Sequence, residues 1–180
     1  MKNIVLLTGS ARRGGNTDLL ASAFIEGAKE AGHSVFRFDA AEKNIDDCKG
    51  CDCCFSNGQA CVYDDDFREL APRLEEADLL VFATPLYWFT FSTSIKAAMD
   101  KMYAFIVGQR PMAVKQCVLL VCGEDKKRSA FDGIVASYKT MLAYKGWQDA
   151  GQIVVTNVLH KGEIENTNAL DEARQLGRRL

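Results

Sequence analysis

Short runs of consecutive apolar residues constrain the fold of this chain more than any other feature. Residues 79–83 read Leu-Leu-Val-Phe-Ala, and residues 117–121 read Cys-Val-Leu-Leu-Val. Neither run alternates with polar residues, so both fit strands that helices cover on both faces. Segments with helical periodicity separate such runs along the chain. The sequence therefore predicts an α/β protein built on a parallel sheet.

The alternation predicts an ordered series of strands and helices. Strands are expected near residues 3–8, 34–39, 78–84, 116–122 and 152–156. Helices are expected near residues 16–31, 66–76, 93–106, 129–145 and 168–178, with Gly32 and Gly146 as helix stops. A chain of 180 residues fits a single domain over residues 1–180. Ligands of open parallel sheets bind beyond the carboxyl ends of the strands, which predicts a site in the loops after strands one, three and four.

A loop rich in glycine and polar residues follows the first apolar run. It reads Gly-Ser-Ala-Arg-Arg-Gly-Gly-Asn-Thr over residues 9–17, where the first helix is expected to begin. Free backbone amides at a helix start favour an anion. The side chains that can add hydrogen bonds to it are those of Ser10, Arg12, Arg13, Asn16 and Thr17. The loop is therefore predicted to bind phosphate.

Two better-known phosphate loops do not fit these residues. Gly9 and Gly14 have the spacing of a P-loop, but Gly15 and Asn16 stand where its Lys and Ser/Thr belong. The dinucleotide motif requires glycine where this chain has Ala11. A terminal monophosphate is the remaining interpretation.

An aromatic loop is expected at the same edge of the sheet. Residues 84–92 read Thr-Pro-Leu-Tyr-Trp-Phe-Thr-Phe-Ser. Tyr87 and Trp88 carry polar groups that suit a planar heteroaromatic ligand, whereas Phe89 and Phe91 fit the core equally well. A phosphate loop beside an aromatic shelf predicts flavin mononucleotide, FMN.

The motifs Gly-Ser-x-Arg-x-x-Gly-Asn-Thr and Thr-Pro-Leu-Tyr-Trp resemble those of the flavodoxin-like NAD(P)H-dependent FMN reductase superfamily, over nearly the whole chain. The resemblance implies a flavodoxin-like three-layer sandwich whose five-stranded parallel sheet has the order 2-1-3-4-5. The FMN-binding residues that it implies are Ser10, Arg12, Asn16, Thr17, Pro85, Leu86, Tyr87, Trp88, Cys122, Gly123 and Glu124.

The resemblance also implies an activity and an assembly. NAD(P)H would supply electrons, and a small-molecule acceptor such as a quinone, flavin, azo or nitro compound would receive them. A homodimer or homotetramer would give Phe89, Phe91 and Tyr103 a place to pack. No catalytic side chain is expected, because the flavin carries the redox chemistry.

A second unusual feature is the cysteine-rich loop, residues 46–62. Cys48, Cys51, Cys54 and Cys61 have the spacing C-x2-C-x2-C-x6-C, and Cys53 is an additional thiol. Four thiolates so close in sequence can bind a [4Fe–4S] cluster. The pattern resembles the iron–sulfur flavoprotein branch of the superfamily, in which the cluster passes electrons to FMN. Zinc, or cysteines that bind no metal, are the alternatives.

Composition excludes several classes of function. The net charge of −2 gives no basic face for nucleic acid, and no apolar stretch is long enough to span a membrane. Seven cysteines without an export signal favour reduced thiols in the cytoplasm. An electron carrier of the flavodoxin type, serving a redox protein partner, is the alternative to an enzyme, and a regulatory protein without flavin is a third possibility.

Overall fold

The computed structural model describes all 180 residues and contains one five-stranded parallel sheet. Its order is β2-β1-β3-β4-β5, as predicted. The strands are β1 (Asn3–Thr8), β2 (Ser34–Asp39), β3 (Leu79–Pro85), β4 (Gln116–Cys122) and β5 (Gln148–Val155). The helices are α1 (Asn16–Glu30), α2 (Phe67–Glu76), α3 (Thr93–Lys101), α4 (Ala104–Val107), α5 (Asp132–Lys145) and α6 (Ala169–Arg178).

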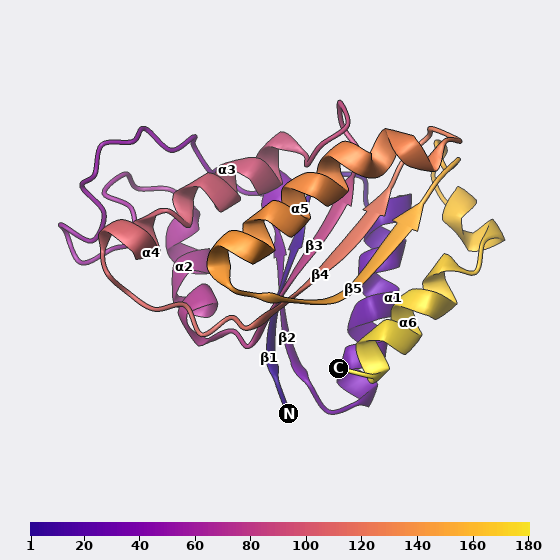
Figure 1. The fold of residues 1–180 in the computed structure, drawn as a ribbon, viewed down its shortest axis with the longest axis horizontal. Helices are drawn as coiled ribbons and strands as arrows, with labels where there is room; N and C mark the ends of the chain where they lie inside the picture. The colour runs from indigo at the N-terminus through magenta and orange to yellow at the C-terminus, as the bar shows by residue number, and fades with distance from the viewer.

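Helices cover both faces of the sheet (Figure 1). Helices α1 and α6 lie on one face, and α2, α3, α4 and α5 lie on the other. Two separate apolar clusters fill the spaces between sheet and helices, and residues of β3 alternate between them: Leu80 and Phe82 belong to one, Leu79 and Val81 to the other. Strand β3 is buried on both faces, which confirms that its continuous apolar run marks a strand covered by helices on both sides.

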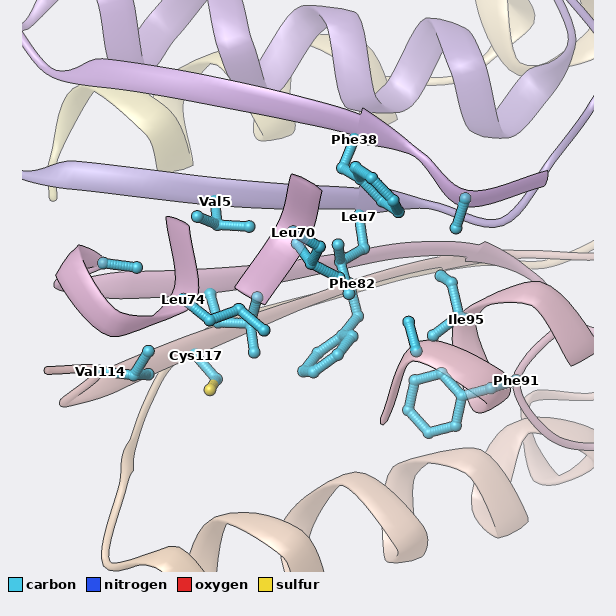
Figure 2. Packing of buried hydrophobic residues seen from close by; sticks show 14 of the residues in the cluster. Val5, Leu7, Phe38, Leu70, Leu74, Phe82, Phe91, Ile95, Val114 and Cys117 are labelled. Atoms are coloured by element: carbon cyan, nitrogen blue, oxygen red, sulfur yellow. The ribbon is translucent and has the colours of Figure 1, made fainter. Parts of the chain in front are cut away.

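Phe91 belongs to the core. Its side chain is buried, and its ring meets the Phe82 ring edge to face, with 5.7 Å between the centroids. Figure 2 shows both rings among the side chains of this cluster. The turn at Tyr87–Thr90 brings the chain back toward the sheet, so that the Phe91 ring packs into the core. The expectation that Phe91 packs at a subunit interface is therefore wrong.

Three elements differ from the prediction by more than one residue. The helix expected over residues 93–106 is divided into α3 and α4, because the amides of Met102 and Tyr103 bond to carbonyls three residues back. A 3₁₀ turn, Arg128–Phe131, precedes α5. Strand β5 begins at Gln148 and not at residue 152. The polar start of β5 has no apolar pattern and is held by backbone pairing with β4 across a bulge.

None of the helices combines the length and the apolar content that a bilayer span requires.

Candidate functional site

Four loops at the carboxyl ends of the strands surround one cavity of about 220 Å³. It is lined by Ser10, Arg12, Gly15, Asn16, Thr17, Pro85, Leu86, Tyr87, Cys122, Gly123, Glu124, Val158 and Leu159. All the residues that the resemblance implies for FMN line it except Trp88. Their binding of FMN stays a prediction, but the fold brings them together from three distant parts of the chain.

Two glycines allow these loops to lie against one another. A side-chain carbon on Gly9 would collide with the Ser92 hydroxyl at the start of α3. A side-chain carbon on Gly123 would lie 3.0 Å from the Leu86 Cβ. Larger residues at either position would push the loops apart and widen the cavity between them.

The two arginines of the phosphate loop have different surroundings. Arg13 forms ion pairs with Asp39, at 3.3 Å, and with Glu42. Arg12 is exposed, forms no ion pair, and lies on the cavity wall. Because two carboxylates already bind the Arg13 side chain, Arg12 is the arginine that remains available to bind phosphate.

The start of α1 supplies hydrogen-bond donors to the same end of the cavity. The backbone amides of Asn16, Thr17 and Asp18 bond to no acceptor in the protein, as expected in the first turn of a helix. The positive end of the helix dipole adds to their attraction for an anion. This end of the cavity therefore suits a phosphate group.

Asn16 has a structural contact that the sequence did not indicate. Its side-chain amide donates to the His160 carbonyl, at 2.9 Å, and its amide oxygen accepts from the Ile164 amide, at 3.2 Å. The side chain was expected to bond phosphate directly. In the structure it joins the segment after β5 to the start of α1 and also lines the cavity, and its bond to phosphate stays a prediction.

The segment after β5 forms a wall of the cavity that sequence reasoning missed. Val158 and Leu159 line the cavity, and the Val158 amide donates to the Gly123 carbonyl, at 3.0 Å. No motif marks these residues. Only their place after the fifth strand of a parallel sheet could have indicated that they reach this edge.

Thr17 and Cys122 meet at the floor of the cavity. The Thr17 hydroxyl lies 3.2 Å from the Cys122 sulfur, and both side chains are buried. Burial raises the pKa of the Cys122 thiol to about 11. Cys122 is therefore a neutral thiol at physiological pH, which is poorly suited to act as a nucleophile.

An ionic cluster supports the phosphate loop from behind. Arg37 on β2 forms ion pairs with Asp18 on α1 and with Asp39, at 2.7 Å to the latter. Burial raises the pKa of Asp39, but hydrogen bonds from Thr8 and Arg37 outweigh it, so that the pKa lies below its ordinary value. The Asp18 carboxylate in turn accepts from the Gly14 amide, at 2.6 Å. These contacts fix the loop to the sheet.

The aromatic loop forms a tight, strained turn at the rim. Tyr87 and Thr90 form two backbone hydrogen bonds across it, at 3.2 and 3.0 Å. The residues between them, Trp88 and Phe89, have φ angles of 45° and 64°, a left-handed conformation that large side chains rarely adopt. Trp88 is 90% exposed at the tip. A non-glycine turn of this kind is a feature of functional sites.

A second, shallower cavity of about 580 Å³ adjoins the first at this rim. Leu86, Tyr87 and Glu124 line both cavities, and Trp88, Phe89, Thr93 and Asp125 complete the second. The turn thus connects the phosphate end of the site with an open aromatic shelf. A ligand with a phosphate at one end and a planar ring at the other fits this arrangement.

The cysteine-rich loop packs elsewhere, against α4. Phe55 meets Phe105 of α4 with 6.1 Å between the ring centroids, and the Arg110 guanidinium lies 4.6 Å from the Phe55 centroid. Neither cavity of the candidate site includes a residue of this loop. The cysteines therefore lie outside the cavity of their own chain.

The cysteines of this loop are close but not arranged as a ready-made metal site. Burial raises the pKa of Cys54, and the neighbouring thiols Cys61, Cys48 and Cys51 raise it further. No group of three or more potential ligands, of the kinds Cys, His, Asp and Glu, is placed to hold a metal ion in this structure.

Sequence comparisons place these features among known flavoproteins. Residues 2–159 match the family described as NADPH-dependent FMN reductase. An iron–sulfur flavoprotein of Archaeoglobus fulgidus is 32% identical over 111 residues, which cover 62% of this chain and 49% of that protein. The present chain thus spans about half the length of this relative. A Bacillus subtilis protein that is named as a putative NAD(P)H-dependent FMN-containing oxidoreductase is 25% identical to this chain. The match covers 98% of this chain and 97% of that protein.

The fold has close counterparts among solved structures. The NAD(P)H:quinone oxidoreductase of Methanothermobacter marburgensis superposes with a TM-score of 0.74 over 98% of both chains, at 18% sequence identity. At that identity the likeness concerns the fold.

Proposed function

The chain belongs to the NADPH-dependent FMN reductase family, and on this basis we propose that it reduces a small, planar, uncharged or cationic acceptor with electrons from NADPH or NADH. It is an FMN-dependent oxidoreductase by family. The proposal concerns the acceptor and the residues that hold the cofactor.

The observation that carries the proposal is the unpaired Arg12 on the wall of a cavity whose other end is formed by Leu86 and Tyr87. Arg12, Ser10 and Thr17, with the free amides of the first turn of α1, would hold the FMN phosphate. Tyr87, Trp88 and Gly123 would lie along the ring system. The donor set fits the cofactor.

FMN, when bound, accepts a hydride from a nicotinamide and gives up electrons to an acceptor. The side chains of this site orient and enclose the reactants. Burial raises the pKa of Cys122, which keeps its proton at physiological pH; that no side chain is catalytic stays a prediction. Tyr87 and Leu86 would shield the reacting ring from water.

The charges of the open shelf favour one class of acceptor. Trp88 and Phe89 provide aromatic surface on one side, and Glu124 and Asp125 provide two carboxylates on the other. Aromatic side chains favour planar conjugated molecules, while the carboxylates repel anions. Neutral quinones and nitroaromatic compounds therefore fit better than sulfonated dyes.

Steady-state oxidation of NADPH and of NADH tests this proposal. An uncharged benzoquinone and its sulfonated derivative serve as matched acceptors. We expect a lower KM for the uncharged quinone, and we expect Glu124→Gln together with Asp125→Asn to reduce the difference. Equal KM values for both acceptors in the wild type would contradict the proposed selectivity.

A second proposal concerns a [4Fe–4S] cluster in the cysteine-rich loop. It is supported by the C-x2-C-x2-C-x6-C spacing of Cys48, Cys51, Cys54 and Cys61 and by the similarity to a named iron–sulfur flavoprotein. Metal sites of this kind commonly form only as the metal binds, so the four thiols would converge on the cluster. A cluster would also allow a redox protein to serve as partner.

Iron and acid-labile sulfide, measured on anaerobically purified protein, test the second proposal. Cys54→Ala should abolish both, while Cys53→Ala should retain them, because Cys53 is outside the four-cysteine pattern. Zinc in place of iron, or no metal in the wild type, would reject the cluster without affecting the proposed reductase activity.

A further inference from the structure

A groove rich in methionine lies on the side of the molecule away from the candidate flavin site. It has a volume of about 250 Å³ and runs between α3, α4 and the end of α5. Four of the five methionines of the chain line it: Met99, Met102, Met112 and Met141. We call this feature the methionine groove. Flexible, polarisable methionines adapt to apolar ligands of varied shape.

Large apolar side chains at its rim remain in solvent. Tyr144 is 75% exposed, and Tyr103 and Ile106 are close to half exposed. Such a concentration of exposed apolar surface around a hollow is typical of a binding site.

A larger, basic cavity continues from the methionine groove. It has a volume of about 680 Å³, lies at the amino ends of β1, β3, β4 and β5, and shares Met112, Lys145 and Trp147 with the groove. The start of β1, marked N in Figure 1, lies at this edge, opposite the arrowheads. We call it the basic cavity.

Positive charge dominates the basic cavity. Four cationic side chains line it, those of Lys2, Arg110, Lys115 and Lys145, against the single carboxylate of Asp78. Arg110 is partly neutralised by Glu75, at 3.5 Å, but no carboxylate pairs with the three lysines. This local excess is opposite in sign to the net charge of −2 of the whole chain.

We propose that the methionine groove and the basic cavity together bind a soluble anionic amphiphile with one apolar chain, such as a long-chain carboxylate. The apolar chain would lie among the methionines, and the carboxylate would lie near Lys115 and Lys145. The basic cavity alone has the volume of a small-molecule site, and the methionine groove extends it. Although Tyr103 at the rim of the groove was expected to pack in a homo-oligomer, a two-fold contact centred on the basic cavity would place its lysines opposite those of a second copy, which favours an anion as the occupant.

The distribution of tryptophan allows a direct test. The chain has two tryptophans: Trp147 lines both of these hollows, and Trp88 lies at the flavin rim. In a Trp88→Phe variant, fluorescence reports on Trp147 alone. We expect dodecanoate with a terminal bromine, a quencher, to quench this fluorescence saturably below its micelle concentration.

Matched ligands and variants separate the apolar and ionic contributions. Shortening the chain by two methylenes should weaken binding about tenfold. Lys115→Gln with Lys145→Gln should also weaken it about tenfold, and more at low than at high salt. Lys29→Gln with Lys139→Gln removes the same charge from exposed sites outside both hollows and should change nothing.

Three results would overturn the proposal. Equal quenching by the brominated alcohol of the same chain length, which carries no charge, would show that the lysines do not contribute to binding. Quenching only by anionic lipid vesicles would indicate a membrane surface as the ligand. Burial of Trp147 in a dimer that forms without ligand, detected by sedimentation, would make this face a subunit interface.

Discussion

The ammonium group of Lys101, at the end of α3, forms an ion pair with the carboxylate of Asp65, and both side chains are almost completely buried. Asp65 also accepts hydrogen bonds from the amides of Asp46 and Phe67, each at 3.0 Å. The pair thus joins both ends of the cysteine-rich loop to the helix that follows the aromatic loop.

Breaking this pair should destabilise the fold. Lys101→Met leaves the Asp65 carboxylate buried without a counterion, so we expect a loss of about 3–5 kcal/mol in the free energy of unfolding, measured with urea. Adding Asp65→Asn should recover part of the loss, because the buried charge is then removed. A change below about 1 kcal/mol in the single variant would show that the pair contributes little.

Adjacent arginines provide a matched test of the phosphate site. Arg12→Ala should weaken FMN binding about tenfold or more, because it removes a charge-assisted hydrogen bond to phosphate. Arg13→Ala should weaken it far less, since Asp39 and Glu42 already hold that side chain. Quenching of FMN fluorescence on binding measures both. Equal losses would contradict the assignment of Arg12.

The strained turn at the rim should lower the stability of the fold while it places aromatic side chains against the ligand. Trp88→Asn with Phe89→Gly places residues that favour positive φ at both positions, so unfolding should require about 1–2 kcal/mol more. The same change should raise the KM for an uncharged quinone, and it should weaken FMN binding less than Arg12→Ala does, because Trp88 would contact the ring system and not the phosphate. An unchanged KM for the quinone would show that the strained turn does not contribute to acceptor binding.

Stability should depend on acidity through Asp18 and Asp39. For both, burial raises the pKa but hydrogen bonds outweigh it and leave the pKa lowered, with Arg37 contributing to each. The resulting stabilisation is present above the unfolded pKa, about 4, and is lost as pH falls through the lower folded values. The difference in unfolding free energy between wild type and Arg37→Met should therefore shrink below about pH 4. Arg68→Met, whose partner Asp64 is exposed, should show no such trend.

Most of the fold could be predicted because apolar runs and helix stops are local signals. The strand bounds of β1, β2 and β4 agree with the prediction, and Gly146 ends α5 in a left-handed conformation. The early start of β5 could not be predicted, because the backbone of β4 and not an apolar pattern holds residues 148–151.

The site was predictable where residue type reports chemistry and unpredictable where it depends on tertiary contacts. The motif already singles out Arg12, but only the structure shows that Asp39 and Glu42 form ion pairs with the neighbouring Arg13. Asn16 looked like a phosphate ligand, but the return of residues 160–164 gives its amide other partners. Phe89 lies within the turn and is exposed, whereas Phe91 follows the turn and is buried.

Anaerobic titration of FMN-loaded protein with NADPH, followed by visible absorption, tests the central claim most directly. The account predicts that the protein binds FMN and that the flavin absorbance is bleached by about one equivalent of NADPH, then restored by an uncharged quinone. A protein that remains colourless after FMN is added, or whose bound flavin neither NADPH nor NADH bleaches, would contradict it.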